Sequence, residues 1–204
     1  MAKQTNQELF VGGLARALKE QRHVDVCLKA GESDEKGVSI SAHKIVLSAR
    51  SEVFKKILES DEIKATTKLE TITLSELKHE ELDALVEFIY SDGTMLSEQG
   101  KQHVMSLFLA ADKYEIPHLR DLCRSHLRTS MNVSNALTVL ALAQIPIDQA
   151  LSDDALGYIR ANMSAICSTA EFEDFVVNYP SLTVEILKGI YDPASGRGAR
   201  YTCN

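Results

Sequence analysis

Basic residues are scarce in this chain, and several features that mark particular classes of protein are missing. Twenty-two lysines and arginines stand against 29 aspartates and glutamates, which gives a net charge of −7 at pH 7. Nucleic-acid binding requires a basic face that releases counterions from phosphate, so this charge argues against general DNA or RNA binding. No apolar run approaches membrane-spanning length, and the N-terminus shows no basic-then-apolar signal pattern. We therefore expect neither nucleic acid nor membrane as a partner.

The few cysteines exclude a disulfide framework. Cys27, Cys123, Cys167 and Cys203 lie far apart, and no two of them form a C-x-x-C pair. Scattered cysteines of this kind are typical of reduced thiols in cytosolic or nuclear proteins. The expected location is therefore cytoplasmic, nuclear or both.

Motifs of catalysis are missing as well. The sequence holds no H-E-x-x-H, no G-x-G-x-x-G after a strand and no Walker-type lysine loop. Cys123 and His126 lie three residues apart on one predicted helix, but two ligands without two more make a poor zinc site. We interpret the chain as a non-enzyme without metal or cofactor.

What the sequence does contain is a succession of amphipathic segments. Its 204 residues suffice for one large domain, or for one standard domain with a helical extension. A helix is predicted over residues 4–21, although Gly12 and Gly13 within it each cost up to about 1 kcal/mol relative to alanine. We infer that this helix needs tertiary or subunit packing for its order. Its apolar face consists of Leu9, Phe10, Leu14 and Leu18.

Three short segments have the alternating pattern of strands. Residues 24–28 and 38–41 form the first two, and the polar turn between them suggests a hairpin. Residues 69–74 form the third. Between the second and third strands, apolar residues recur at helical spacing on both sides of Ser51. This spacing predicts two short helices, with Ser51 as the N-cap of the second.

Helices dominate the rest of the sequence. One helix ends near Gly93, because glycine readily adopts the left-handed backbone conformation that terminates a helix. Another has Pro117 in its first turn, where the N–H that proline lacks would have no partner within the helix. Beyond Met131 the pattern is helical only, and residues 192–204 are predicted to be disordered. The expected helices lie near residues 82–89, 104–111, 117–127, 133–140, 147–159, 171–177 and 182–191.

Four segments, taken in order, resemble the BTB/POZ domain. They are the x-D-V strand at 24–26, H-K-x-V-L followed by S-x-x-F within 43–54, F-I-Y-S-D-G at 88–93 and A-D-K-Y-E-I-P-H-L at 111–119.

The resemblance implies an α+β fold, in which a small β-sheet is flanked by helices. It assigns residues 1–22 to an N-terminal amphipathic helix and residues 23–131 to the BTB/POZ domain. Residues 132–191 are similar to the start of a BACK-type helical extension. In its acidic, compact composition the chain is most similar to small plant BTB/POZ proteins.

The resemblance also implies a protein-interaction module that dimerises, with itself or with another BTB protein. In this family the N-terminal helix often packs across the twofold axis, which places the dimer interface at the four apolar residues of that helix. Folding back of this face onto its own domain is the alternative. Asp25 and Lys44 match residues that line a charged pocket near the interface, although a partly buried ion pair is the other interpretation. Their neighbour His43 is interpreted as a hydrogen-bonded structural residue.

Many members of the family place a substrate protein on a cullin-3 ubiquitin ligase, and the resemblance implies that adaptor role here. The matching cullin-binding residues are Ile63, Tyr114, Ile116 and Leu119. Good binders carry a hydrophobic-x-Glu motif before the third strand, whereas this chain has alanine in place of the glutamate. A lost charged hydrogen bond of this kind costs about 1.5 to 3 kcal/mol.

Two other functions stay open. A dimerisation scaffold in transcriptional regulation, without ligase binding, is favoured by the missing glutamate and by the lack of a MATH, kelch or ankyrin segment. A Skp1-like or channel-assembly relative of the same fold is disfavoured by the long N-terminal helix and the H-K-x-V-L run. The sequence names no substrate and does not choose between homodimer and heterodimer.

Overall fold

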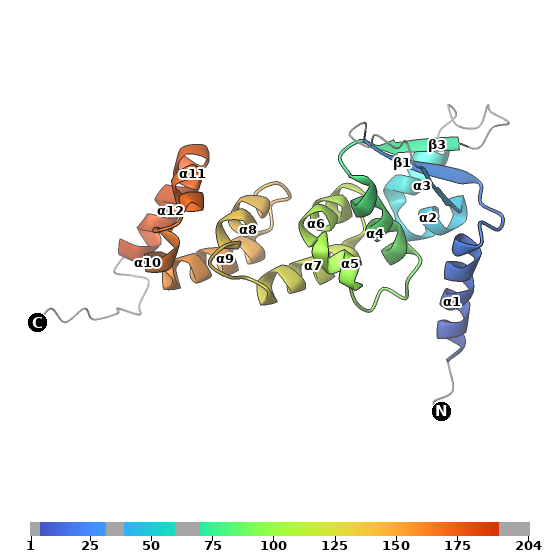
Figure 1. Ribbon diagram of the computed structural model, residues 1–204, viewed down its shortest axis with the longest axis horizontal. Coiled ribbons are helices and arrows are strands. Elements are labelled where there is room, and N and C mark those ends of the chain that lie inside the picture. The colour runs from blue at the N-terminus through green and yellow to red at the C-terminus, as the bar shows by residue number, and fades with distance from the viewer. Residues whose placement is uncertain (1–4, 32–38, 60–69, 192–204) are drawn as a thin grey trace, which may run out of the picture. The chain divides into compact units, whose positions relative to one another are not determined.

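The computed structural model describes residues 5–31, 39–59 and 70–191. The chain divides into two compact units, Met1–His126 and Leu127–Asn204, and Figure 1 colours it from the N-terminus to the C-terminus. The predictions for the polar turn after Gly31, for Ile63 and for the C-terminal tail lie outside the described residues.

A three-stranded sheet lies in the first unit (Figure 1). Its central strand β1 (Val26–Ala30) is antiparallel to β2 (Ser39–Ala42) and parallel to β3 (Glu70–Leu74). Leu28 is fully buried and the next residue, Lys29, is exposed, because successive side chains of a strand point to opposite faces. The sheet therefore buries one face against the helices of the unit.

Short polar contacts set where these helices begin and end. The hydroxyl of Ser51 accepts the backbone N–H of Phe54 at 3.0 Å, which is the predicted N-cap bond of the second helix in the pair. Gly93 has a φ of +75°, the left-handed conformation expected of it. The helices are α1 (Asn6–Lys19), α2 (Lys44–Arg50), α3 (Glu52–Glu59), α4 (His79–Ile89), α5 (Glu98–Gln102), α6 (Val104–Lys113) and α7 (Pro117–Thr129), which runs past the unit boundary.

Apolar side chains from the sheet and from α2, α3, α4, α6 and α7 form the core of the first unit. The ring of Phe54 stacks on that of Tyr114, with 4.7 Å between the centroids, and this contact joins α3 to the end of α6. Each large apolar side chain buried in this way contributes about 1.5 to 3 kcal/mol. Other fully buried members are Leu28, Leu47, Leu74, Leu82, Leu85, Ile89, Leu107, Phe108 and Leu119.

All secondary-structure elements in the described part of the second unit are helices. α8 packs on α9, and α12 packs on both α9 and α11. Its core contains Leu140, Leu151, Ile159, Ile166 and Ile186. The helices are α8 (Ala136–Leu142), α9 (Gln149–Ala161), α10 (Met163–Ile166), α11 (Ala170–Asn178) and α12 (Pro180–Tyr191).

The predicted fold class, a small sheet with helices and a helical extension, is confirmed. Several details differ from the prediction. The first strand begins at Val26 and not at residue 24, and the Asp25 side chain instead accepts the backbone N–H of Lys44 at the start of α2. The second strand runs to Ala42 and α8 covers Ala136–Leu142, so the strand ends and the helix begins later along the chain than predicted. The short helices α5 and α10 were not predicted, since a segment of four or five residues is too short to show an apolar period. The division of the sequence at residues 22, 131 and 191 stays a prediction.

Candidate protein-interaction site

α1 presents an apolar face that its own unit leaves largely uncovered. Leu9 and Phe10 are 57% and 67% exposed, Leu14 and Leu18 are half-buried, and α1 has no buried residue. A contiguous apolar face in contact with water marks a surface that takes part in protein association. The structure thus brings the four predicted dimer-interface residues together on one helix, while the interface itself stays a prediction.

Local bonds shape α1 as a helix. Thr5 and Glu8 form a capping box, in which Oε2 of Glu8 accepts the Thr5 N–H at 2.6 Å and Oγ1 of Thr5 accepts the Glu8 N–H at 3.2 Å. Apart from the adjoining backbone of α1, no atom lies within 4 Å of where a Cβ of Gly12 or Gly13 would stand, so no packing compensates for their low helix propensity. We therefore expect a partner that covers the apolar face to stabilise α1.

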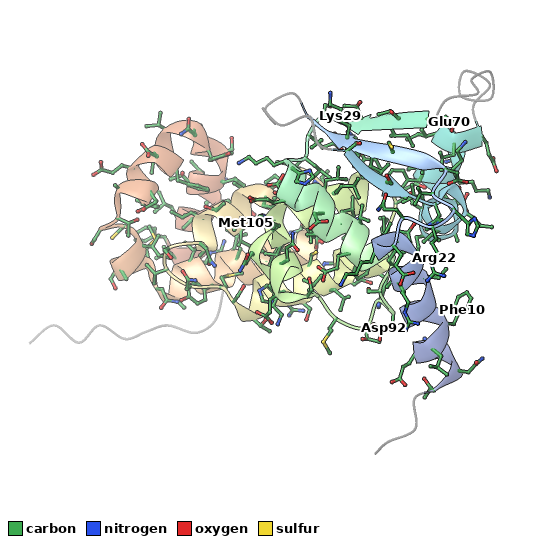
Figure 2. All side chains as sticks on the ribbon, turned by 45° about the vertical axis from the view of Figure 1, so that its right-hand side comes forward. Phe10, Arg22, Lys29, Glu70, Asp92 and Met105 are labelled. Carbon is green, nitrogen blue, oxygen red and sulfur yellow. The ribbon has the colours of Figure 1, made fainter. Side chains whose placement is uncertain are left out.

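A groove of about 530 Å³ runs between α1 and the helices behind it. Figure 2 labels Phe10 of α1 and Asp92 of the loop after α4, which belong to two of its walls. Ile45 of α2 also lines the groove and is 78% exposed, although it occupies a helix of the core. The lining residues are Gln7, Phe10, Val11, Leu14, Ile45, Val46, Ala49, Arg50, Ile89, Tyr90, Ser91 and Asp92.

Hydrogen bonds around His43 hold one wall of this groove. Its backbone N–H donates to the Tyr90 hydroxyl at 2.8 Å, its Nδ1 lies 2.7 Å from the same oxygen, and its Nε2 lies 2.7 Å from the carbonyl oxygen of Arg22. A carbonyl only accepts, so Nε2 carries a proton and donates it to Arg22, while the hydroxyl donates to Nδ1. Burial raises the pKa of Tyr90 to about 12, which keeps this hydroxyl protonated. His43 therefore has a structural role here.

Arg50 fixes the end of α4 at the same groove. Its Nε donates to the carbonyl oxygen of Ile89 at 3.0 Å and its Nη2 to that of Ser91 at 2.5 Å. A guanidinium at the C-terminus of a helix satisfies otherwise unpaired carbonyls and opposes the negative end of the helix dipole. His118 adds a bond from Nε2 to the carbonyl of Gly93 at 2.5 Å. Side-chain hydrogen bonds thus hold the part of the groove that lies opposite α1.

The structure brings Asp25 and Lys44 together, but through the lysine backbone. The carboxylate of Asp25 accepts the backbone N–H of Lys44 at 2.7 Å, at the first turn of α2. The Lys44 ammonium instead pairs with the carboxylate of Glu70, which Figure 2 labels at the start of β3. The alternative interpretation, an ion pair between Asp25 and Lys44, is therefore replaced by a pair with Glu70. The charged pocket stays a prediction.

Three of the predicted cullin-binding residues lie close together in the core. Tyr114 and Ile116 are each 4% exposed and Leu119 is fully buried, so none of these side chains is presented to solvent. The exposed residues at this junction between α6 and α7 include Lys113 and Glu115. A partner would meet these neighbours first, and the cullin-binding role of the three buried residues stays a prediction.

Glu76 holds this junction in place from the loop after β3. The Tyr114 hydroxyl donates to its Oε1 at 2.5 Å, and the Lys113 ammonium lies 2.9 Å from its Oε2. Burial alone raises the pKa of Glu76, but the bonds from Tyr114 and Lys113 together outweigh burial and leave the pKa below its ordinary value. Burial, together with this carboxylate, raises the pKa of Tyr114. The pair is therefore a carboxylate and a neutral phenol at neutral pH.

The described residues offer no centre for metal chemistry. Among them, no group of three or more histidine, cysteine or acidic side chains is placed to hold a metal ion. Cys123 is fully buried, and burial raises the pKa of its thiol to about 12, which leaves it protonated and unreactive. Within the described ranges, no helix is both long and apolar enough to cross a membrane.

Of the residues that shape the groove, sequence reasoning singled out Phe10 and Leu14 and missed others. Ile45, Arg50 and Tyr90 received no role, although all three lie within or beside recognised motifs. For Ile45, the available signal was its position: it is an apolar residue on the otherwise polar side of a short helix. No signal in the sequence connects Arg50 with carbonyl groups about forty residues later in the chain.

The known proteins to which this chain is similar share one type of domain. Residues 14–131 match the family model of the BTB/POZ domain. The chain is 70% identical over 155 residues to the putative BTB/POZ domain-containing protein At2g40440 of Arabidopsis thaliana, a match that covers 76% of this chain and 94% of that protein. It is 62% identical over 190 residues to the putative BTB/POZ domain-containing protein At2g40450, covering 92% of this chain and 90% of the other. It is 59% identical over 189 residues to the BTB/POZ domain-containing protein At5g48510, covering 92% and 84%. Both of these relatives are also from Arabidopsis thaliana.

Proposed function

The chain belongs to the BTB/POZ domain family, whose domains are protein-interaction modules, and from this premise we propose that it is a non-catalytic adaptor of a cullin-3 ubiquitin ligase. In this role the protein holds a substrate protein close to the ligase and catalyses no covalent chemistry itself. The observation that carries the proposal is the family match over residues 14–131, in a chain that continues into a second, helical unit.

The adaptor acts as a dimer built on α1. The support is the largely uncovered apolar face of α1 beside a groove of about 530 Å³. A second BTB subunit that covers this face buries Leu9 and Phe10, and each such side chain contributes about 1.5 to 3 kcal/mol when fully buried. A dimer presents two cullin sites and two substrate sites, which raises avidity without new contacts. The partner is a second copy of this chain or another BTB protein, in the cytoplasm, the nucleus or both.

Cullin-3 binds the first unit at the segment around Ile63 and at the junction of α6 and α7. The family resemblance supports this placement, and Ile63 supplies the apolar anchor. Because alanine replaces the motif glutamate, we expect weaker binding than that of a chain with the complete motif, by a factor corresponding to about 1.5 to 3 kcal/mol.

The experiment is calorimetric titration of the purified cullin-3 N-terminal domain into this protein. Ile63→Asp is the test variant, and Met95→Asp is the control, because Met95 is an exposed apolar residue of the same unit. We expect binding near the micromolar range that Ile63→Asp abolishes and Met95→Asp preserves. Tyr114→Ala is a poor test variant, because it also removes the stacking on Phe54 and the bond to Glu76.

A dimerisation scaffold without ligase binding is the second candidate, and the missing glutamate favours it. A well-folded dimer that shows no heat of binding with cullin-3 would reject the adaptor proposal and support this scaffold.

A further inference from the structure

A cavity of about 300 Å³ lies in the first unit between α4 and α5. We call it the α4–α5 cavity. Its apolar lining includes the buried side chains of Phe88, Leu96 and Leu107, together with Met95, which is 70% exposed. Asp92, which Figure 2 labels, lines both this cavity and the groove next to α1. Pockets for drug-sized ligands measure about 300 to 1,000 Å³, so a cavity at the lower limit suits a smaller group, such as one long side chain.

The charged side chains that line the α4–α5 cavity leave an excess of negative charge. Three carboxylates and one ammonium group line it, those of Glu87, Asp92, Glu98 and Lys101. The Lys101 ammonium lies 2.6 Å from Oε1 of Glu98, and this bond holds the pKa of Glu98 below its ordinary value. The carboxylates of Glu87 and Asp92 therefore have no cation within the lining to balance them.

Both of these carboxylates are held through one oxygen only. Oδ1 of Asp92 accepts the backbone N–H and the hydroxyl of Thr94, at 2.9 and 2.8 Å, and these bonds hold the pKa of Asp92 below its ordinary value. Oε2 of Glu87 accepts the hydroxyl of Ser97 at 2.5 Å. No described residue donates a hydrogen bond to Oδ2 of Asp92 or to Oε1 of Glu87. Arg50 lies near Asp92, but it lines the groove, and its Nε and Nη2 bond backbone carbonyls.

This combination of groups selects the kind of occupant. A lysine or arginine side chain has an apolar stem that packs on apolar surface and a charged end that reaches a polar partner. An exposed ion pair alone contributes little, so the apolar lining matters as much as the carboxylates. A neutral apolar group would take water from the carboxylates without replacing it, and an anionic group would be repelled. Shape and charge together therefore favour a cation on an apolar stem.

We propose that the α4–α5 cavity is a docking pocket for a lysine or arginine side chain of a protein that this chain binds. The stem of that side chain lies against Phe88 and Leu107, and its charged end meets the carboxylates of Glu87 and Asp92. The proposal goes beyond the adaptor role and does not depend on it, because cullin binding is placed at the junction of α6 and α7 and dimerisation at α1.

The test uses the full chain, labelled with ¹⁵N, and the peptide Gly-Ser-Gly-Arg-Gly-Ser-Gly with blocked ends. A matched peptide carries citrulline, which has nearly the shape of arginine without its charge, and spermidine is the third probe. The amide resonance of Gly100 reports binding, because Gly100 lines the cavity.

The test variant is Glu87→Gln with Asp92→Asn. The amide oxygens of the new side chains still accept the bonds from Ser97 and Thr94, so we expect this variant to fold. The control is Glu80→Gln, which removes an exposed carboxylate of the same helix outside the cavity lining.

We expect the arginine peptide to bind with a Kd of about 1 mM at low salt and the citrulline peptide to bind at least about tenfold more weakly. The test variant loses about tenfold in affinity for the arginine peptide, and Glu80→Gln loses less than about twofold. Equal binding of the two peptides, or no saturable shift of Gly100 up to about 10 mM, overturns the proposal. An equal loss in Glu80→Gln overturns it, because the overall charge of α4 would then be the cause. Tighter binding of spermidine than of the arginine peptide overturns it in favour of a free polyamine. A failed cullin titration leaves all of these outcomes unchanged.

Discussion

Replacing Ser51 with alanine removes one hydroxyl that makes two buried bonds. Ser51 is 3% exposed; its Oγ accepts the N–H of Phe54 at 3.0 Å and donates to the carbonyl oxygen of Tyr114 at 2.5 Å. Loss of the N-cap costs about 1 kcal/mol, and a buried carbonyl left without its donor costs about 1 to 3 kcal/mol. Because the two losses share one atom, we expect a total of about 2 to 3 kcal/mol in the free energy of unfolding of the first unit.

Urea unfolding followed by far-UV circular dichroism measures this loss, since the chain has no tryptophan for fluorescence. For a unit of this size the expected change lowers Tm by roughly 10 °C. The matched control is Ser48→Ala in the middle of α2, which we expect to be neutral or slightly stabilising because alanine has the higher helix propensity. A loss below about 0.5 kcal/mol for Ser51→Ala, or equal effects of the two variants, would refute the reasoning.

Three further predictions concern glycine packing, acid stability and assembly. Gly31→Ala places a Cβ against the backbone of the loop after β3 and is expected to lower the free energy of unfolding by about 1 to 3 kcal/mol. Gly157→Ala meets open space in a helix and is expected to raise it by about 0.5 to 1 kcal/mol. Thermal unfolding distinguishes the two variants. Folding lowers the pKa of Glu76, so the stability that this carboxylate contributes is complete above the ordinary glutamate pKa and is lost as the pH falls through the lower, folded-state pKa. Glu76→Gln is expected to remove this part of the acid dependence when the free energy of unfolding is measured against pH. An unchanged pH curve contradicts the prediction. We expect Phe10→Ser to convert the proposed dimer to monomer in analytical ultracentrifugation without unfolding the chain, because α1 has no buried residue. Ala15→Ser, at another exposed position of α1, leaves the mass unchanged, and a dimer that survives Phe10→Ser places the interface elsewhere.

Sequence patterns predicted the elements well where a local signal exists. The left-handed Gly93 and the capping Ser51 are short-range features, because each depends on residues within one turn of the chain. The apolar face of α1 was readable for the same reason, since helical spacing alone defines it.

Contacts between residues distant in the sequence could not be predicted from such local patterns. The parallel pairing of β1 with β3, the bonds from Arg50 to the end of α4 and the pair of Lys44 with Glu70 each join residues at least 26 positions apart. Burial of Tyr114 was also unpredicted, because the motif that contains it was interpreted from the family's contact surface and not from packing.

The sheet order has a consequence for the chain as it leaves the ribosome. β1 occupies the centre of the sheet, but its two neighbours are synthesised at very different times: β2 follows within a short loop, whereas β3 comes after both α2 and α3. Until β3 has emerged, one edge of β1 lacks its hydrogen-bonding partner and the apolar side of the hairpin is uncovered. While residues 43–70 are being translated, the nascent chain therefore presents an unpaired strand edge that is open to wrong strand pairing.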